Sequence, residues 1–246
     1  MLGDPETGDV AIRGGLLIDG SGAAPRRADL LLSGGRISAV GDVPKLHGGT
    51  EIDAGGLCVA PGFIDIHSHS DYYLLINPEA SSKLLQGVTT EVGGNCGYAA
   101  APVWGAERRE RQAIYREHFG IETPWEDIEG YSEQLGAQGI SVNYAHLIGH
   151  NTVRASAMGM DDRPPTEAEM ERMRGAVDAG MRAGAFGLST GFVYAPACFA
   201  QSQEFIELAQ VARDHGGLVA SHIRSEGDGL VEAIEEILDI GREANI

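Results

Sequence analysis

Two histidines, His67 and His69, stand two residues apart in the segment APGFIDIHSHSD, which covers residues 60–71. The apolar lead-in is typical of a buried strand, and side chains two apart on a strand point to the same face. Neutral imidazole is the commonest protein ligand for a catalytic divalent metal. We therefore interpret His67 and His69 as half of a metal site rather than as polar residues that happen to end a strand.

Cys96 and His222 are two further side chains that can bind a metal. Cys96 comes just after a predicted strand over 88–93, and His222 ends another over 217–222. Because the carboxyl ends of neighbouring parallel strands meet on one side of a sheet, where ligands bind, both are expected beside the two histidines. A thiolate binds a borderline-soft ion such as Zn2+ well and loses its proton on coordination. The alternative for Cys96 is a buried free cysteine that packs as a small hydrophobic residue.

The elements that would position these residues follow an α/β pattern. From Leu57 onward, short apolar runs alternate with amphipathic segments, which is typical of βα units around a parallel sheet. Strands are predicted over 57–66, 88–93, 142–148, 185–190 and 217–222. Helices are predicted over 78–86, 106–118, 125–137, 166–183, 202–215 and 229–244. Thr166, with Glu169 three residues later, predicts a capping box at the start of the fourth helix, and Gly216 favours a helix end.

The amino-terminal region has a different pattern and predicts a small β-unit over residues 1–56, separate from residues 57–246. Short strands are predicted over 10–12, 16–18, 29–32 and 37–40. Gly34 and Gly35 favour a tight hairpin turn with positive φ between the last two.

Charge and composition restrict the possible partners. The chain has 246 residues and a net charge of −18, which argues against binding to a phosphate backbone and therefore against nucleic acid. No apolar run approaches the length of a membrane span, and the first residues lack the pattern of a signal peptide, so a soluble cytoplasmic protein is predicted. The three cysteines are too widely spaced for a disulfide framework, and we interpret Cys58 and Cys198 as buried hydrophobic residues.

Several motifs together resemble one enzyme family. These are the Pro-Gly lead-in with His-x-His, the segment GGNCG over 93–97, GLSTGFVY over 187–194 and SHIRSE over 221–226. In this order they resemble the N-acyl-D-amino-acid deacylases, or D-aminoacylases, of the amidohydrolase superfamily. The resemblance runs from about Val10 to the last residue.

The resemblance implies a (β/α)8 TIM barrel with a small β-sandwich, completed in the family by residues from the far carboxyl terminus. It implies one or two divalent ions, Zn2+ in the first instance, held by His67, His69, Cys96 and His222. Tyr194, in the loop after the fourth strand, would contact the carboxylate of an N-acyl-D-amino acid. Related enzymes bridge two metals with a carboxylated lysine on the fourth strand, but the chain holds only Lys45 and Lys83, neither of them there.

The implied reaction is hydrolysis of a linear N-acyl amide. The metal would polarise the scissile carbonyl and lower the pKa of a bound water to about 7. The superfamily's catalytic aspartate, on the eighth strand, and a further histidine, on the sixth, would lie beyond Ile246. The chain therefore resembles a truncated amino-terminal part, with no catalytic carboxylate of its own and no activity expected by itself.

Two alternatives to the deacylase interpretation remain open. One is a different amidohydrolase that acts on a cyclic amide, and the other is a non-catalytic barrel fragment. An incomplete barrel exposes an apolar sheet edge, so a separately supplied barrel half or an oligomer is also expected. The substrate would be a small molecule, whose side chain and acyl group the sequence leaves undetermined.

Overall fold

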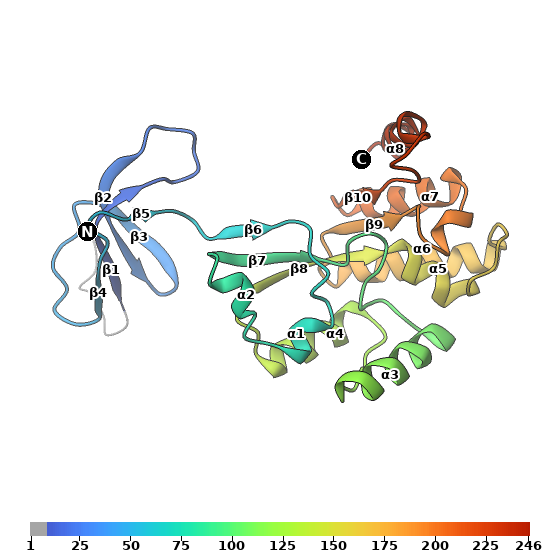
Figure 1. The fold of residues 1–246 in the computed structure, drawn as a ribbon, viewed down its shortest axis with the longest axis horizontal. Coiled ribbons are helices and arrows are strands. Elements are labelled where there is room, and N and C mark those ends of the chain that lie inside the picture. The colour runs from blue at the N-terminus through green and yellow to red at the C-terminus, as the bar shows by residue number, and fades with distance from the viewer. Residues whose placement is uncertain (1–8) are drawn as a thin grey trace. The chain divides into compact units, whose positions relative to one another are not determined.

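The computed structural model describes residues 9–246, and the chain divides into two compact units between Gly62 and Phe63 (Figure 1). The sequence predicts this boundary earlier, between residues 56 and 57, because the apolar run from Leu57 reads as one strand. The structure divides that run into β5 (Cys58–Val59) and β6 (Phe63–Asp65), which belong to different units.

The first unit contains one five-stranded sheet in the order β3-β2-β1-β4, with β5 also paired to β1. Its other strands are β1 (Val10–Leu17), β2 (Arg26–Ser33), β3 (Arg36–Gly41) and β4 (Thr50–Asp53). The strands predicted over 10–12 and 16–18 are a single strand, β1, whose register shifts between Ile12 and Gly15. The predicted hairpin between β2 and β3 is confirmed, since Gly34 and Gly35 have φ of 56° and 73°.

The second unit contains a parallel sheet of five strands in the order β10-β9-β8-β7-β6. After β6 come β7 (Val88–Gly93), β8 (Asn143–Gly149), β9 (Gly187–Gly191) and β10 (Leu218–His222). Strands that are neighbours in this sheet are also neighbours in strand order along the chain. The carboxyl ends of all five strands lie on the same side of the sheet. The predicted α/β class and parallel strand pattern are confirmed.

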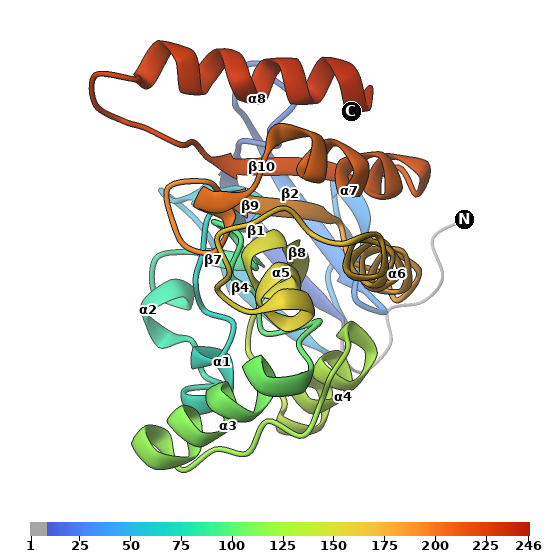
Figure 2. The same ribbon diagram turned by 90° about the vertical axis from the view of Figure 1, so that its right-hand side faces the viewer.

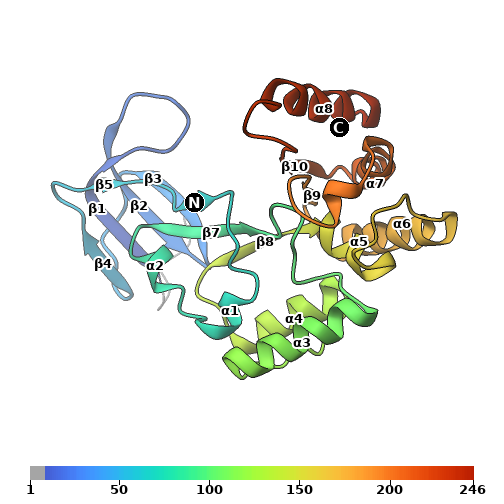
Figure 3. The ribbon, with the colours of Figure 1, turned by 45° about the vertical axis from the view of Figure 1, so that its right-hand side comes forward.

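Helices connect these strands. They are α1 (Tyr73–Ile76), α2 (Ser81–Leu84), α3 (Gly105–Phe119), α4 (Ile128–Gln138), α5 (His150–Met158), α6 (Glu167–Arg182), α7 (Ser202–Asp214) and α8 (Leu230–Ala244). Helix α6 packs against α7 and α7 against α8 (Figures 2 and 3). The predicted capping box at Thr166 is present, and Gly216, just after α7, has φ of 72°. Between residues 9 and 246 no helix combines the length and apolarity needed to cross a bilayer.

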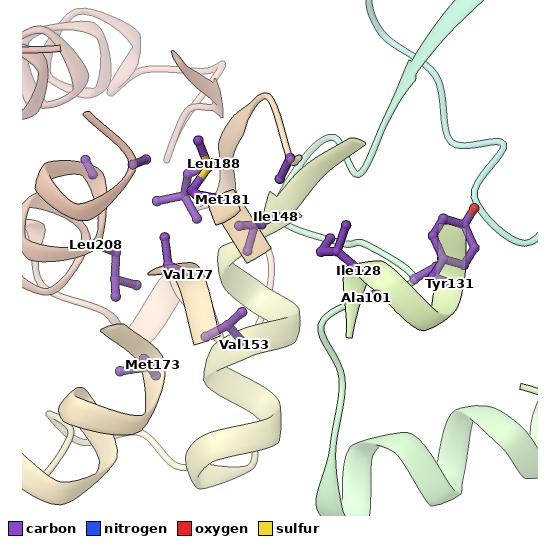
Figure 4. Packing of buried hydrophobic residues seen from close by; sticks show 14 of the residues in the cluster. Ala101, Ile128, Tyr131, Ile148, Val153, Met173, Val177, Met181, Leu188 and Leu208 are labelled. Atoms are coloured by element: carbon purple, nitrogen blue, oxygen red, sulfur yellow. The ribbon is translucent and has the colours of Figure 1, made fainter. Parts of the chain in front are cut away.

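The core of the second unit lies between the sheet and its helices. Figure 4 shows side chains from β8, β9 and the helices turned toward one another, and the fully buried ones include Ile148, Val153, Met173, Val177, Leu188 and Leu208. Burial of each such side chain contributes roughly 1.5–3 kcal/mol. This packing anchors β8 and β9 to the helices.

Helix α5 has no counterpart among the predicted helices. Its sequence, HNTVRASAM, has no apolar stripe, yet His150, Asn151, Thr152 and Arg154 are all 0% exposed. The helix is buried nearly all round, and its polar side chains are satisfied by hydrogen bonds to neighbouring elements. A periodicity analysis therefore cannot detect it.

The strand that leads to His67 is less buried than its apolar sequence suggests. Phe63, Ile64 and Ile66 are 62%, 61% and 74% exposed. The reason is topological, because β6 pairs only with β7 and forms an edge of the sheet. The interpretation of Cys58 as buried is also wrong: β5 is a two-residue strand paired with β1, and Cys58 is exposed. Cys198 is partly buried.

Candidate metal centre

The loops that follow β6 and β7 lie side by side because these two strands are parallel neighbours. The Ser68 amide donates to the Val92 carbonyl over 3.0 Å. The Asn95 side-chain amide donates to the same carbonyl over 2.8 Å. The loop with the two histidines is thereby joined to the loop with Cys96.

Within the described part of the chain, His67, His69 and Cys96 form a cluster whose ligand atoms all lie within 4.8 Å of one another. His67 Nε2 is 3.2 Å from Cys96 Sγ, and the two imidazole rings have centroids 5.4 Å apart. In a tetrahedral zinc site, bonds of about 2.0 Å to nitrogen and 2.3 Å to sulfur put ligand atoms roughly 3.3–3.5 Å apart. Two imidazoles and a thiol at these separations suit a borderline-soft divalent ion.

The backbone at Cys96 has a conformation that few side chains tolerate. Cys96 has φ of 53°, in the left-handed region that glycine and asparagine normally occupy. The flanking Gly94 and Gly97 also have positive φ, and a Cβ on Gly94 would lie 2.0 Å from the Leu147 carbonyl oxygen. Backbone strain at a cysteine where glycine would fit better is typical of a functional position.

The protonation of Cys96 depends on its surroundings. Burial raises the pKa of the Cys96 thiol, and the negative charge of Glu226 raises it further. The metal-free thiol is therefore protonated at neutral pH, and a metal that binds there displaces the proton. Gly191, which pairs with His222 in the sheet, packs so closely on Cys96 that a Cβ there would lie 2.3 Å from the Cys96 carbonyl oxygen.

His222 is the last residue of β10, at the carboxyl edge of the sheet, but it is not part of the three-residue cluster. Its Nε2 is 3.1 Å from Glu226 Oε1. Its ring also packs edge-on against Tyr194, with centroids 4.9 Å apart. The structure therefore brings three of the four predicted ligands together and places the fourth at the same carboxyl end of the sheet, paired with a carboxylate.

The chain matches a known protein family over most of its length. The sequence pattern of the amidohydrolase family matches residues 50–244. The chain belongs to this family.

Two relatives of the chain are named for D-configured substrates. It is 42% identical over 243 residues to the D-aminoacylase of Alcaligenes xylosoxydans xylosoxydans, covering 99% of this chain and 50% of the relative. It is 43% identical over 244 residues to the N-acyl-D-aspartate deacylase of the same organism, covering 97% and 48%. The chain thus spans about half the length of the curated relatives it matches. The resemblance inferred from the motifs is confirmed.

A solved structure has the same fold. The N-acyl-D-glutamate deacylase from Bordetella bronchiseptica, complexed with zinc and a phosphonate inhibitor that mimics the tetrahedral intermediate, matches with a TM-score of 0.87. The two chains are 40% identical, and the match covers 98% of this chain and 50% of that one.

Tyr194 of this amidohydrolase lies in the loop after β9 and is 40% exposed. Fully buried Asn151, on α5, fixes this loop: its side-chain amide donates to the Gly191 carbonyl over 3.1 Å and to the Tyr194 carbonyl over 3.2 Å. Its Oδ1 accepts from the Gly191 amide over 3.0 Å. Tyr194 is thus held beside His222 with its phenol accessible.

A cavity of about 490 Å³ opens beside His69. Its walls combine aromatic and apolar side chains, among them Tyr98 and Tyr115, with charged ones, among them Glu107 and Arg111. His69 is the one member of the cluster that lines it, and Tyr194 does not.

Sequence reasoning missed several residues that support the amidohydrolase site. Asn151 is hidden in a helix that was not predicted. Glu91 and Ser68, which are bonded to each other over 2.7 Å, were not identified either. One signal could have pointed to Glu91, since a carboxylate inside a strand predicted to be buried needs a buried partner.

Proposed function

We propose that the protein to which this chain belongs hydrolyses the amide bond of N-acyl-D-amino acids with a divalent metal, Zn2+ in the first instance. The observation that carries the proposal is the cluster of His67, His69 and Cys96, whose ligand atoms lie within 4.8 Å. Similarity at about 40% identity to three kinds of D-specific deacylase supports the substrate class.

The residues of the chain would divide the work as follows. His67, His69 and Cys96 would hold the ion, with the Cys96 thiolate offsetting part of its positive charge. His222 would be a further ligand if its Nε2 exchanged Glu226 for the ion. When bound, a divalent ion would supply Lewis-acid chemistry for the amide carbonyl. The phenol of Tyr194, which faces the same edge, donates a hydrogen bond to the carboxylate of the substrate.

We propose further that the whole protein completes a (β/α)8 barrel and that the first sheet contributes to a β-sandwich. Apolar side chains exposed at both ends of the second unit support the barrel. Ile64 and Ile66 are exposed beside β6, and Val231, Ile234 and Leu238 are 63%, 41% and 50% exposed along α8. Further βα units or a second copy of the chain would cover these surfaces.

The experiment compares enantiomers and amide types. The protein, expressed at the full length of its reading frame and loaded with Zn2+, is given N-acetyl-D-amino acids, their L-enantiomers and a cyclic imide, and release of free amine or ring-opened product is measured. We expect release from the D-series alone, lost on chelation and restored by Zn2+. Ring opening of the imide without release from the D-series would instead support a cyclic amidohydrolase, and equal rates for D and L would contradict the substrate assignment.

A further inference from the structure

His67 and His69 lie where packing alone cannot hold them. Both are exposed, and they follow the edge strand β6, in which Phe63 and Ile64 are also exposed. A metal ligand must keep its orientation within a narrow range to bind tightly. Something other than a hydrophobic core must therefore fix this loop.

Ser68, between the two histidines, points the opposite way and is only 4% exposed. Its hydroxyl donates to Glu91 Oε2 over 2.7 Å. Since a serine has one hydroxyl proton and Ser68 gives it to the carboxylate, the Ser70 hydroxyl must be the donor in the 2.7 Å contact between the two serine oxygens. The Ser70 amide also donates to Ser68 Oγ over 3.1 Å. Ser68 Oγ is thus bonded both to Glu91 on β7 and to Ser70 in its own loop.

Glu91, on β7, is 0% exposed, and its second oxygen, Oε1, lies 3.7 Å from Lys83 Nζ. Burial of a carboxylate is costly unless it is paired and hydrogen-bonded. Lys83 is the only lysine of the second unit, since the chain holds just Lys45 and Lys83. Lys83 therefore supplies a counter-charge for the buried Glu91 carboxylate, whose Oε1 accepts no hydrogen bond.

Lys83 also connects the network back to the strand that precedes the histidines. Its Nζ is 2.5 Å from Asp65 Oδ2, and this hydrogen bond lowers the pKa of Asp65. Asp65 Oδ1 in turn accepts from the His67 amide over 3.2 Å. A closed chain of polar contacts thus runs from the His67 backbone through Asp65, Lys83 and Glu91 to Ser68.

We propose that Ser68 and Glu91 are positioning residues of the metal centre, which set the orientation of His67 and His69 by anchoring the loop between them to β7. Neither touches the metal or the substrate. The inference rests on the metal site proposed above. It follows that loss of the Ser68 hydroxyl weakens metal binding while the fold and all the ligands remain.

The test measures the Zn2+ affinity of the metal-free protein, expressed at the full length of its reading frame, by competition with a chromophoric chelator, for the wild type, Ser68→Ala and Ser156→Ala. Ser156 is the matched control, since its hydroxyl accepts from the Trp104 amide over 3.2 Å and is not part of the network. We expect Ser68→Ala to bind about 10–100-fold more weakly, the usual cost of losing the hydrogen-bond support of a ligand loop, and Ser156→Ala to bind as the wild type does.

A second variant, Glu91→Gln, keeps the shape of the side chain and one acceptor oxygen. The double variant of Ser68→Ala and Glu91→Gln tests whether the two residues act through the same contact. We expect less than the product of the two single losses, because both remove one anchor. Circular dichroism shows whether each variant is folded. If one single variant is unfolded, the Zn2+ affinity of the other single variant decides the test. Wild-type Zn2+ affinity in a folded Ser68→Ala or Glu91→Gln variant would overturn the positioning role of these residues but not the metal centre. Full additivity of the two affinity losses in the double variant would do the same. Failure of the wild type to bind Zn2+ would overturn the metal centre itself.

Discussion

Replacing Cys96 by Ala is expected to lower the Zn2+ affinity of the chain by more than about 100-fold, beyond what loss of a ligand's hydrogen-bond partner costs. The thiol is the sulfur donor of the cluster, and its Sγ lies 3.2 Å from His67 Nε2. The variant leaves the two imidazoles of the cluster and removes its negatively charged ligand. Equilibrium dialysis followed by metal analysis measures the loss.

The other two cysteines provide controls in the same chain. Cys58 is exposed in the first unit, and Cys198 is partly buried after β9. Cys58→Ala and Cys198→Ala are expected to retain Zn2+ as the wild type does. If all three alanine variants bind equally well, Cys96 is only a buried thiol, and the deacylase assignment loses its most specific support.

Replacing Glu204 by Gln is expected to destabilise the fold by about 3–5 kcal/mol, the usual cost of removing one partner from a buried ion pair. Glu204 Oε1 is 3.0 Å from Arg154 Nε and 2.8 Å from His150 Nε2, and these three side chains are at most 3% exposed. The glutamine keeps the volume but leaves a buried guanidinium without its counter-charge. Urea denaturation measures the change in the free energy of unfolding.

Glu207→Gln is the matched control, on the same helix α7. Its carboxylate is 2.7 Å from Arg174 NH1, but the two side chains are 33% and 27% exposed. Pairs in such a position contribute about 0–1 kcal/mol, so a small change is expected. If the two variants lose a similar free energy of unfolding, burial does not strengthen the interactions of Glu204 with Arg154 and His150.

The sequence predicts the parts of this fold that depend on short-range patterns. The alternation of apolar runs and amphipathic segments locates β7 to β10 within two residues at each end, because each strand forms a short run rich in apolar residues between segments of different pattern. His67 and Cys96 could be expected near each other, since each follows a strand and parallel strands end at one edge. The distance of 3.2 Å between them required the structure.

The parts that could not be predicted depend on contacts between distant residues. Helix α5 is polar in sequence and buried by its partners, as in the bond of 2.9 Å between His150 Nδ1 and Thr190 Oγ1. The exposure of β6 follows from its edge position, which its own apolar residues cannot reveal. Likewise, the pairing of His222 with Glu226 depends on side-chain conformations that strand position alone does not determine.

The metal centre is tested most directly by titration of the metal-free chain with Co2+, followed by absorption spectroscopy. Cobalt occupies sites of nitrogen and sulfur ligands much as zinc does, and a cobalt–thiolate bond gives a strong near-ultraviolet charge-transfer band. We predict a band that saturates at a fixed ratio of metal to chain, persists in Cys58→Ala and Cys198→Ala, and is absent in Cys96→Ala. No band in the wild type, or an undiminished band in Cys96→Ala, would contradict a metal centre built on His67, His69 and Cys96.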